Sequence, residues 1–75
     1  MLLDSYDYET IRADEVKPGD FIWYLDKPNR VIEVTTNKET TTFTVISGDG
    51  MYGATSFIQP NGEPQVKILN SGVLF

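Results

Sequence analysis

The residues that could perform chemistry in this chain are carboxylates and serines, because the sequence contains neither cysteine nor histidine. Asp14 and Glu15 are adjacent, and Ser47 precedes the run 48–50, Gly-Asp-Gly. A nucleophilic serine needs an activating base, and general acid–base catalysis needs a carboxyl group whose pKa is moved by burial or by a close partner. Aspartates in turns more often bond their own backbone. The sequence therefore predicts a protein that is not an enzyme.

Metal and phosphate sites are indicated only by fragments of motifs. Asp49 between two glycines matches part of a calcium loop, but the alternating acidic ligands of such a loop are absent. Asp4, Asp7 and Glu9 could gather a weak cation, although a solvated acidic terminus is the simpler interpretation. The glycines of 48–53 lack the strand-to-helix context of a phosphate loop and are typical of a hairpin turn. We expect neither a metal nor a cofactor.

Aromatic residues offer a different kind of site, since the chain has one tryptophan, four tyrosines and four phenylalanines. A core of this size accommodates about half of them. The expected core comprises Phe21, Phe43 and Phe57, with Ile22 or Trp23, Ile32, Val34, Val45 and Ile58. Tyrosine and tryptophan are enriched at interfaces because they combine apolar area with a polar group. The predicted partner-binding residues are Asp4, Tyr6, Asp7, Tyr8, Glu9, Trp23, Tyr24 and Tyr52. The alternative is that the tyrosines pack half-buried over the edge of the fold.

Length and charge limit the classes of protein that remain. The 75 residues suit a single domain, 1–75, with one small core and no deep active site. Eleven acidic against six basic residues give a net charge of −5, and the basic residues are scattered, so we expect no direct nucleic-acid binding. No apolar run approaches the roughly 20 residues that span a bilayer, so we expect a cytoplasmic protein without membrane association. The oligomeric state stays open.

Turn-forming residues divide the chain into short segments rich in β-branched and aromatic side chains. The expected strands are residues 21–25, 30–36, 40–47, 51–58 and 65–69. Alternation places Phe43 and Val45 on one face of 40–47, and Ile32 and Val34 on the apolar face of 30–36. The segment 21–25 does not alternate, so it is covered on both faces or presents aromatics to a partner. The pattern predicts an all-β fold, a small barrel of five or six short antiparallel strands.

The first fifteen residues concentrate the acidic charge, with five acids against Arg12 alone. Two sets of residues alternate there, with Tyr6, Tyr8 and Thr10 in one set and Asp7, Glu9 and Ile11 in the other. This alternation favours an edge strand over a helix, whose apolar stripe would be interrupted by Asp7. We predict that 1–15 forms an acidic N-terminal arm or edge strand, and the alternative is a frayed, solubilising terminus.

The segments 16–22 (VKPGDFI) and 26–34 (DKPNRVIEV) resemble the opening hairpin of KOW-like, SH3-like barrels, as in the first domain of the elongation factor P family. The resemblance implies that Gly19 forms a tight turn, that Pro28 presets the hairpin turn and that Val31 opens the paired strand. In that family the next loop is flanked by glycines and carries a modified lysine or arginine that reaches into the ribosome. The corresponding loop here, 36–40, is short and has no glycine, although it contains Lys38.

These observations lead to one preferred function and two alternatives. The preferred function is a non-enzymatic protein-interaction module, such as a small adaptor, an inhibitor or a phage or mobile-element accessory protein. It would bind another protein through surface aromatics with an acidic rim. The alternatives are a KOW-like barrel associated with nucleic acid or translation, and an acidic mimic of nucleic acid. Salt separates these classes, because binding by a mimic weakens steeply with ionic strength.

Overall fold

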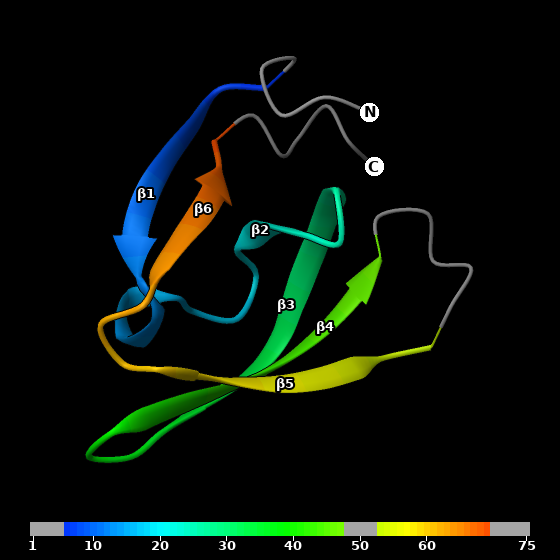
Figure 1. The fold of residues 1–75 in the computed structure, drawn as a ribbon. Helices are drawn as coiled ribbons and strands as arrows, with labels where there is room; N and C mark the ends of the chain where they lie inside the picture. The colour runs from blue at the N-terminus through cyan, green and yellow to red at the C-terminus, as the bar shows by residue number, and fades with distance from the viewer. Residues whose placement is uncertain (1–5, 48–52, 70–75) are drawn as a thin grey trace.

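A computed structural model describes residues 6–47 and 53–69 of the chain as a single antiparallel sheet that curls on itself (Figure 1). The elements are β1 (Tyr8–Arg12), the 3₁₀ turn η2 (Ala13–Glu15), β2 (Phe21–Tyr24), β3 (Lys27–Thr36), β4 (Thr40–Ser47), β5 (Thr55–Pro60) and β6 (Pro64–Ile68). The strand order is β1-β6-β2-β3-β4-β5. The predicted all-β fold of five or six antiparallel strands is confirmed.

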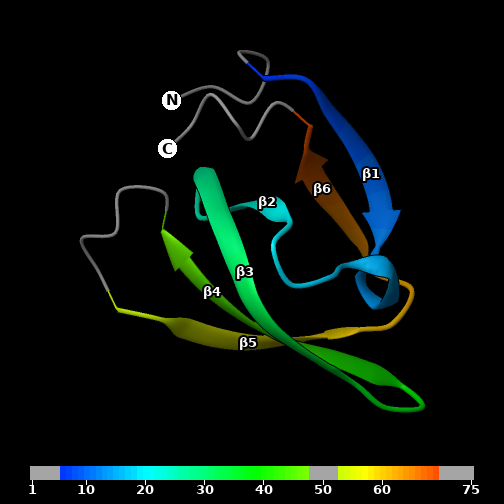
Figure 2. The same ribbon diagram turned by 180° about the vertical axis from the view of Figure 1, so that it is seen from behind.

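The two edge strands approach each other at one end of the sheet. The Ala13 N–H donates to the carbonyl oxygen of Glu63 at 2.9 Å, and the Asp14 N–H donates to that of Asn61 at 3.1 Å. These bonds join η2, which follows β1, to the turn between β5 and β6. Seen from behind, the hairpin of β3 and β4 extends past the rest of the sheet (Figure 2). The sheet is therefore closed at one end, while β1 and β5 remain its edges.

Strand β4 supplies the centre of the core through strict alternation. Phe43 and Val45 are buried, whereas Thr42, Thr44 and Ile46 on the other face are only half-buried, as predicted. The buried apolar cluster consists of Ala13, Val16, Ile22, Val31, Phe43 and Val45, with Ile11, Tyr24, Val34 and Phe57 packed against it. A period of two in the sequence is enough to orient such a strand.

Strand β2 explains the aromatic run that does not alternate. It lies between β3 and β6, so both of its edges are paired. Ile22 is fully buried, and Phe21, Trp23 and Tyr24 are half-buried. Side chains on both faces of the run are therefore buried or half-buried, which favours the first of the two interpretations of the sequence, although Trp23 keeps some exposed surface. Ile22, rather than Trp23, is the core residue.

Two predicted core residues are instead exposed. Ile32 is 44% exposed because the register of β3 against β4 shifts between Val31 and Glu33, so that Val31 takes the buried position. A bulge of this kind inserts a residue and moves its neighbours to the other face. Ile58 is 60% exposed because its neighbour Phe57 faces the core, and adjacent strand residues point to opposite faces.

The hairpin between β2 and β3 differs from the expectation drawn from Pro28. The turn consists of Leu25 and Asp26, both with positive φ (54° and 62°), between the paired residues Tyr24 and Lys27. Pro28 lies buried inside β3, opposite Trp23, so the prediction that it presets the turn is wrong. With positive φ at both positions the loop is of type I′, whose backbone matches the twist of the strands, and Pro cannot adopt positive φ.

Replacing Leu25-Asp26 with Asn-Gly is expected to stabilise the protein. Leu is disfavoured at positive φ and Asp is only tolerated there, whereas Asn-Gly is the preferred pair for such a turn. The greater freedom of glycine in the unfolded chain offsets part of the gain, leaving about 1 kcal/mol. Thermal denaturation should show a melting temperature raised by about 4–8 °C. An unchanged or lower melting temperature would contradict the turn conformation described here.

Gly19 occupies the tight turn before β2, as predicted. Its φ is +97°, and the Asp20 N–H donates to the Lys17 carbonyl oxygen across the turn at 3.1 Å. The Asp20 side chain accepts a hydrogen bond from the Lys17 N–H at 3.0 Å. The Gly19 N–H then donates to the Val31 carbonyl oxygen at 2.7 Å, which ties the turn to β3.

Gly19→Val is expected to cost about 1–3 kcal/mol, because a β-branched residue is strained at positive φ. A Cβ at this position would meet no atom within 4 Å, so the cost comes from the backbone alone. Gly62→Val is the matched control, since a Cβ there would meet no atom closer than 4.0 Å and its φ is not positive. Chemical denaturation of both variants tests this, and equal losses would refute the backbone explanation.

Candidate functional site

The N-terminal approach to β1 meets β2 through an aromatic contact. The ring centroids of Tyr6 and Trp23 are 5.8 Å apart, with the planes tilted by 56°. Two residues further on, Tyr8 lies in β1 opposite Ile68 and keeps 47% of its surface exposed. We call Tyr6, Tyr8 and Trp23 the aromatic edge. Tilted pairs of this kind hold the rings in a defined orientation.

The backbone beside the aromatic edge is half-paired. The Leu69 N–H donates to the Asp7 carbonyl oxygen at 2.9 Å, so Asp7 bonds toward β6. Because bonding alternates along an antiparallel strand, Tyr8 and Thr10 direct their N–H and C=O groups to the outer side. The Arg12 N–H follows the same alternation and donates to the Glu15 carboxylate at 2.9 Å instead of to β6. Strand β1 therefore has backbone N–H and C=O groups available for pairing at Tyr8. At the other end of the strand, the Arg12 N–H is already bonded to Glu15.

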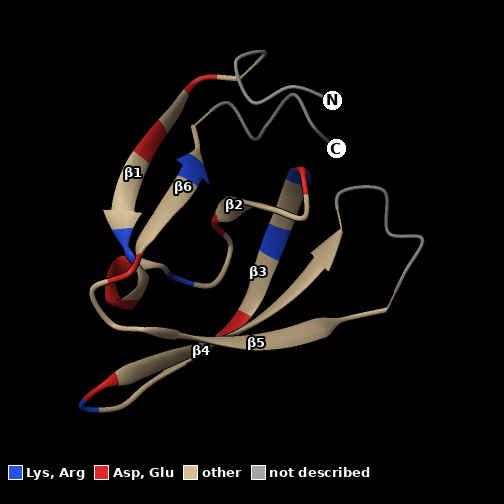
Figure 3. Ribbon diagram, viewed as in Figure 1, with Lys and Arg blue, Asp and Glu red and all other residues tan. Residues whose placement is uncertain are grey.

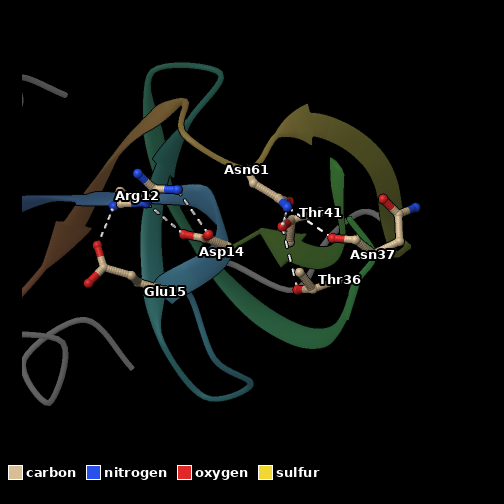
Figure 4. A network of polar contacts seen from close by, with 7 residues as sticks. All are labelled: Arg12, Asp14, Glu15, Thr36, Asn37, Thr41 and Asn61. Atoms are coloured by element: carbon tan, nitrogen blue, oxygen red, sulfur yellow. Dashed lines mark hydrogen bonds and ion pairs between the residues drawn. The ribbon is translucent and has the colours of Figure 1, made fainter. Parts of the chain in front are cut away.

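The acidic charge of this region divides into two groups. Asp14 is paired with Arg12 through two contacts, Nε–Oδ1 at 3.0 Å and Nη2–Oδ2 at 3.1 Å (Figure 4). The hydrogen bond from Arg12 lowers the pKa of the Asp14 carboxyl, and the same bond raises the pKa of Arg12. Asp14 and Glu15 thus hold the corner after β1, while Asp7 and Glu9 are the exposed acids next to the tyrosines.

Besides Arg12, a lysine of β6 contributes positive charge to this region. Lys67 lies opposite Glu9 in the sheet register, and its Nζ is 3.6 Å from Oδ1 of Asp20. Opposite charges across neighbouring strands stabilise the pairing modestly. Figure 3 shows the Lys and Arg positions spread over several elements of the described chain.

Tyr24 belongs to a separate aromatic group. Its ring stacks on Phe57 with centroids 4.1 Å apart and planes within 2°, and Phe57 in turn meets Phe43 at 5.2 Å. This stack joins the core, so the structure does not bring Tyr24 to the aromatic edge. Beside it is an open pocket of about 300 Å³ lined by Tyr24, Leu25, Lys27, Asn29, Val45, Ser47, Gly53 and Thr55. Asp4 and Tyr52, as well as the hairpin predicted at 48–50, lie outside the described residues.

Sequence reasoning missed a polar network around Asn61, in the turn between β5 and β6 (Figure 4). Its N–H donates to the Glu39 carbonyl oxygen and its Nδ2 to that of Asn37, both at 2.9 Å. Its Oδ1 accepts from the hydroxyl of Thr41, which is fully buried, at 2.8 Å. The loop 37–39 is therefore braced from another part of the chain. In the sequence, the asparagine–glycine pair at 61–62 predicted a turn but none of these hydrogen bonds.

Clusters of metal-ligating side chains and membrane-spanning helices are both absent from the part of the chain that the structure describes. Within residues 6–47 and 53–69, no group of three or more Asp, Glu, His or Cys side chains lies close enough together to hold a metal ion. Within the same ranges, no helix is long and apolar enough to cross a membrane. The candidate site that the geometry supports is the aromatic edge with Asp7 and Glu9.

Comparison with known proteins gives a likeness of fold. No family model and no curated protein matches the sequence. Among solved structures, the chain is similar to a translation initiation factor eIF-5A family protein from Naegleria fowleri, with a TM-score of 0.71 and 22% sequence identity. The match covers 83% of this chain and 47% of that protein, so the chain spans about half of its length. The likeness fits the resemblance of residues 16–34 to KOW-like, SH3-like barrels.

Proposed function

We propose that this chain is a non-enzymatic protein-interaction module that binds another protein through the aromatic edge. The observation that carries the proposal is the half-exposed Tyr8 on an edge strand, with the Tyr6–Trp23 contact beside it. Aromatic side chains held in place lose little conformational entropy on binding and bury a large apolar area. Asp7 and Glu9 would form an acidic rim, which favours a partner with basic residues around an apolar centre.

The backbone of β1 supports the same proposal. Tyr8 and Thr10 face outward with their N–H and C=O groups, so an extended segment of the partner could add to the sheet beside the tyrosine. The Glu15 cap on Arg12 limits this added pairing to the first part of β1. Exposed acids along such an edge also prevent indiscriminate strand pairing.

The test compares partner binding by three proteins. The wild type, the double variant Tyr6→Ala/Tyr8→Ala and the control Ile32→Ser are used to capture proteins from the native cell extract. Ile32 is 44% exposed on β3, so its replacement removes apolar surface without changing either edge strand. The dissociation constant of the captured partner is then measured by calorimetry. The double variant should lose more than about 1 kcal/mol of binding free energy, while Ile32→Ser should bind as the wild type does.

Three outcomes would count against the proposal. If the double variant keeps full affinity while remaining folded, the site lies elsewhere on the chain. If the wild type shifts duplex DNA or structured RNA at micromolar concentration and physiological salt, the translation-associated alternative gains support, consistent with the fold of the eIF-5A family protein. If partner binding collapses as salt rises, the acidic mimic is favoured, because aromatic anchors are less sensitive to screening.

A further inference from the structure

We propose that the outer edge of β5 is a self-pairing surface, at which two copies of this chain align their β5 strands antiparallel. This edge is distinct from β1 and its aromatic edge, which lie at the other end of the strand order. Strand β5 pairs with β4 along one side. In the part of the chain that the structure describes, no strand lies along the other side.

The hydrogen bonds near the β3–β4 loop determine which backbone groups face that outer side. The Asn37 N–H donates to the Thr40 carbonyl oxygen, and the Asn61 N–H donates to the Glu39 carbonyl oxygen, each at 2.9 Å. Thr40 therefore bonds toward β3, and Glu39 bonds toward the β5 side. Because bonding alternates along antiparallel strands, the next residue of β4 to bond toward β5 is Thr41.

The same alternation extends along β5. Thr41, Phe43 and Val45 bond to their register partners Gln59, Phe57 and Thr55. The N–H and C=O groups of Ser56 and Ile58 must then point away from β4, to the outer edge. Pro60 has no N–H and ends this row of donors. The edge thus offers two complete donor–acceptor residues, spaced as an incoming antiparallel strand requires.

Charge makes a second copy of this chain a suitable occupant. The eight residues of β4 and the six of β5 include no Asp, Glu, Lys or Arg, and both strands are uncharged throughout in Figure 3. Each copy carries a net charge of −5. Two such molecules repel each other least where their uncharged strands meet. The β1 edge, with Glu9 and Arg12 in the strand, lacks this property.

The side chains of β5 allow a symmetric arrangement. Pairing Ser56 of one copy with Ile58 of the other places a two-fold axis at Phe57, so each copy uses the same residues, as a closed dimer requires. Ile58 is 60% exposed and would be covered by the second copy. The Ser56 hydroxyl already lies 2.9 Å from the hydroxyl of Thr44, so covering it leaves no unpaired polar group.

The small size of this surface predicts a weak dimer. A six-residue strand buries less than a standard interface, so we expect a dissociation constant of roughly 10 μM to 1 mM. Sedimentation velocity from 20 μM to 2 mM, a range chosen around this estimate, should show a monomer that shifts to a dimer. Higher salt should strengthen the dimer, because it screens the repulsion between two acidic molecules.

The deciding variants place the same change on the two edges. Ile58→Lys introduces a charge on β5, and Tyr8→Lys introduces it on β1. Ile58→Lys should weaken the dimer at least tenfold, and Tyr8→Lys should leave it unchanged. A wild type that stays monomeric up to 2 mM, or a dimer that survives Ile58→Lys, would overturn the proposal. So would a dimer lost only in Tyr8→Lys, which would assign the contact to β1.

Hydrogen exchange of the wild type tests the proposal without any variant. The amides of Ser56 and Ile58 face the outer edge, so their exchange should slow several-fold at concentrations where the dimer forms. The Tyr8 and Thr10 amides, which face outward on β1, are the internal control and should not slow. Exchange at Ser56 and Ile58 that is independent of concentration would contradict the proposed pairing. This result does not depend on the partner of the aromatic edge, so the two proposals can fail separately.

Discussion

Phe43→Ala lowers the free energy of unfolding by about 3–5 kcal/mol, the range expected for a buried phenylalanine truncated to alanine. The Phe43 side chain is fully buried at the centre of β4, and its ring meets Phe57 at 5.2 Å. Phe57 in turn stacks on Tyr24, so removing the Phe43 ring opens a cavity beneath both. A domain of 75 residues has a total stability of roughly 4–11 kcal/mol, so this loss is a large part of the free energy of unfolding of the whole domain.

Urea denaturation followed by tryptophan fluorescence measures this loss. Phe43→Leu keeps most of the apolar volume and should lose clearly less stability than Phe43→Ala. Thr42→Ala is the surface control, because Thr42 lies on the opposite face of the same strand and should change stability by less than about 1 kcal/mol. If Phe43→Ala and Thr42→Ala lost the same amount, β4 would not have the orientation described here.

Asn61→Ala is expected to cost about 2–3 kcal/mol, more than a typical polar substitution near the surface. It removes the bond from Nδ2 to the Asn37 carbonyl oxygen and the acceptor for the Thr41 hydroxyl. Thr41 has no exposed surface, so its hydroxyl keeps only the longer contact with the Thr36 hydroxyl at 3.4 Å. A buried donor left without a good acceptor destabilises the folded state by the full desolvation penalty of that group.

A double-mutant cycle with Thr41→Val separates the bond from other effects of Asn61→Ala. Valine keeps the shape of threonine but has no hydroxyl, so in the Thr41→Val background no buried donor is left unpaired. Asn61→Ala should then cost at least about 1 kcal/mol less than in the wild type, as measured by chemical denaturation. Additive losses would show that the Asn61–Thr41 bond contributes nothing to stability.

Strand β1 shows how far the sequence could describe the candidate site. The alternation of Tyr6 and Tyr8 with Asp7 and Glu9 predicted an edge strand, and β1 is an edge of the sheet. The roles of Asp14 and Glu15 were not predictable in this way, because their ion pair and backbone bond depend on how the chain turns after Arg12. Partner binding by the aromatic edge stays a prediction.

Local chemistry was sufficient wherever a residue's conformation depends on its immediate neighbours. Gly19 adopts positive φ because the turn after Pro18 requires it, and β4 alternates because each side chain follows the pleat. Composition also limited the chemistry, since a chain without cysteine or histidine lacks the commonest nucleophile–base pairs. These features follow from covalent geometry and residue type, so the sequence by itself determined them.

Tertiary structure decided every feature that depends on distant segments. The bulge after Val31 exposes Ile32, because pairing with β4, and not the alternation within β3, determines which residues of β3 face the core. The contact of Tyr6 with Trp23, the stack of Tyr24 on Phe57 and the bonds of Asn61 join residues that no periodicity relates. Such contacts form only when strands far apart in the chain pair in one register, because pairing energies between strands outweigh local preference.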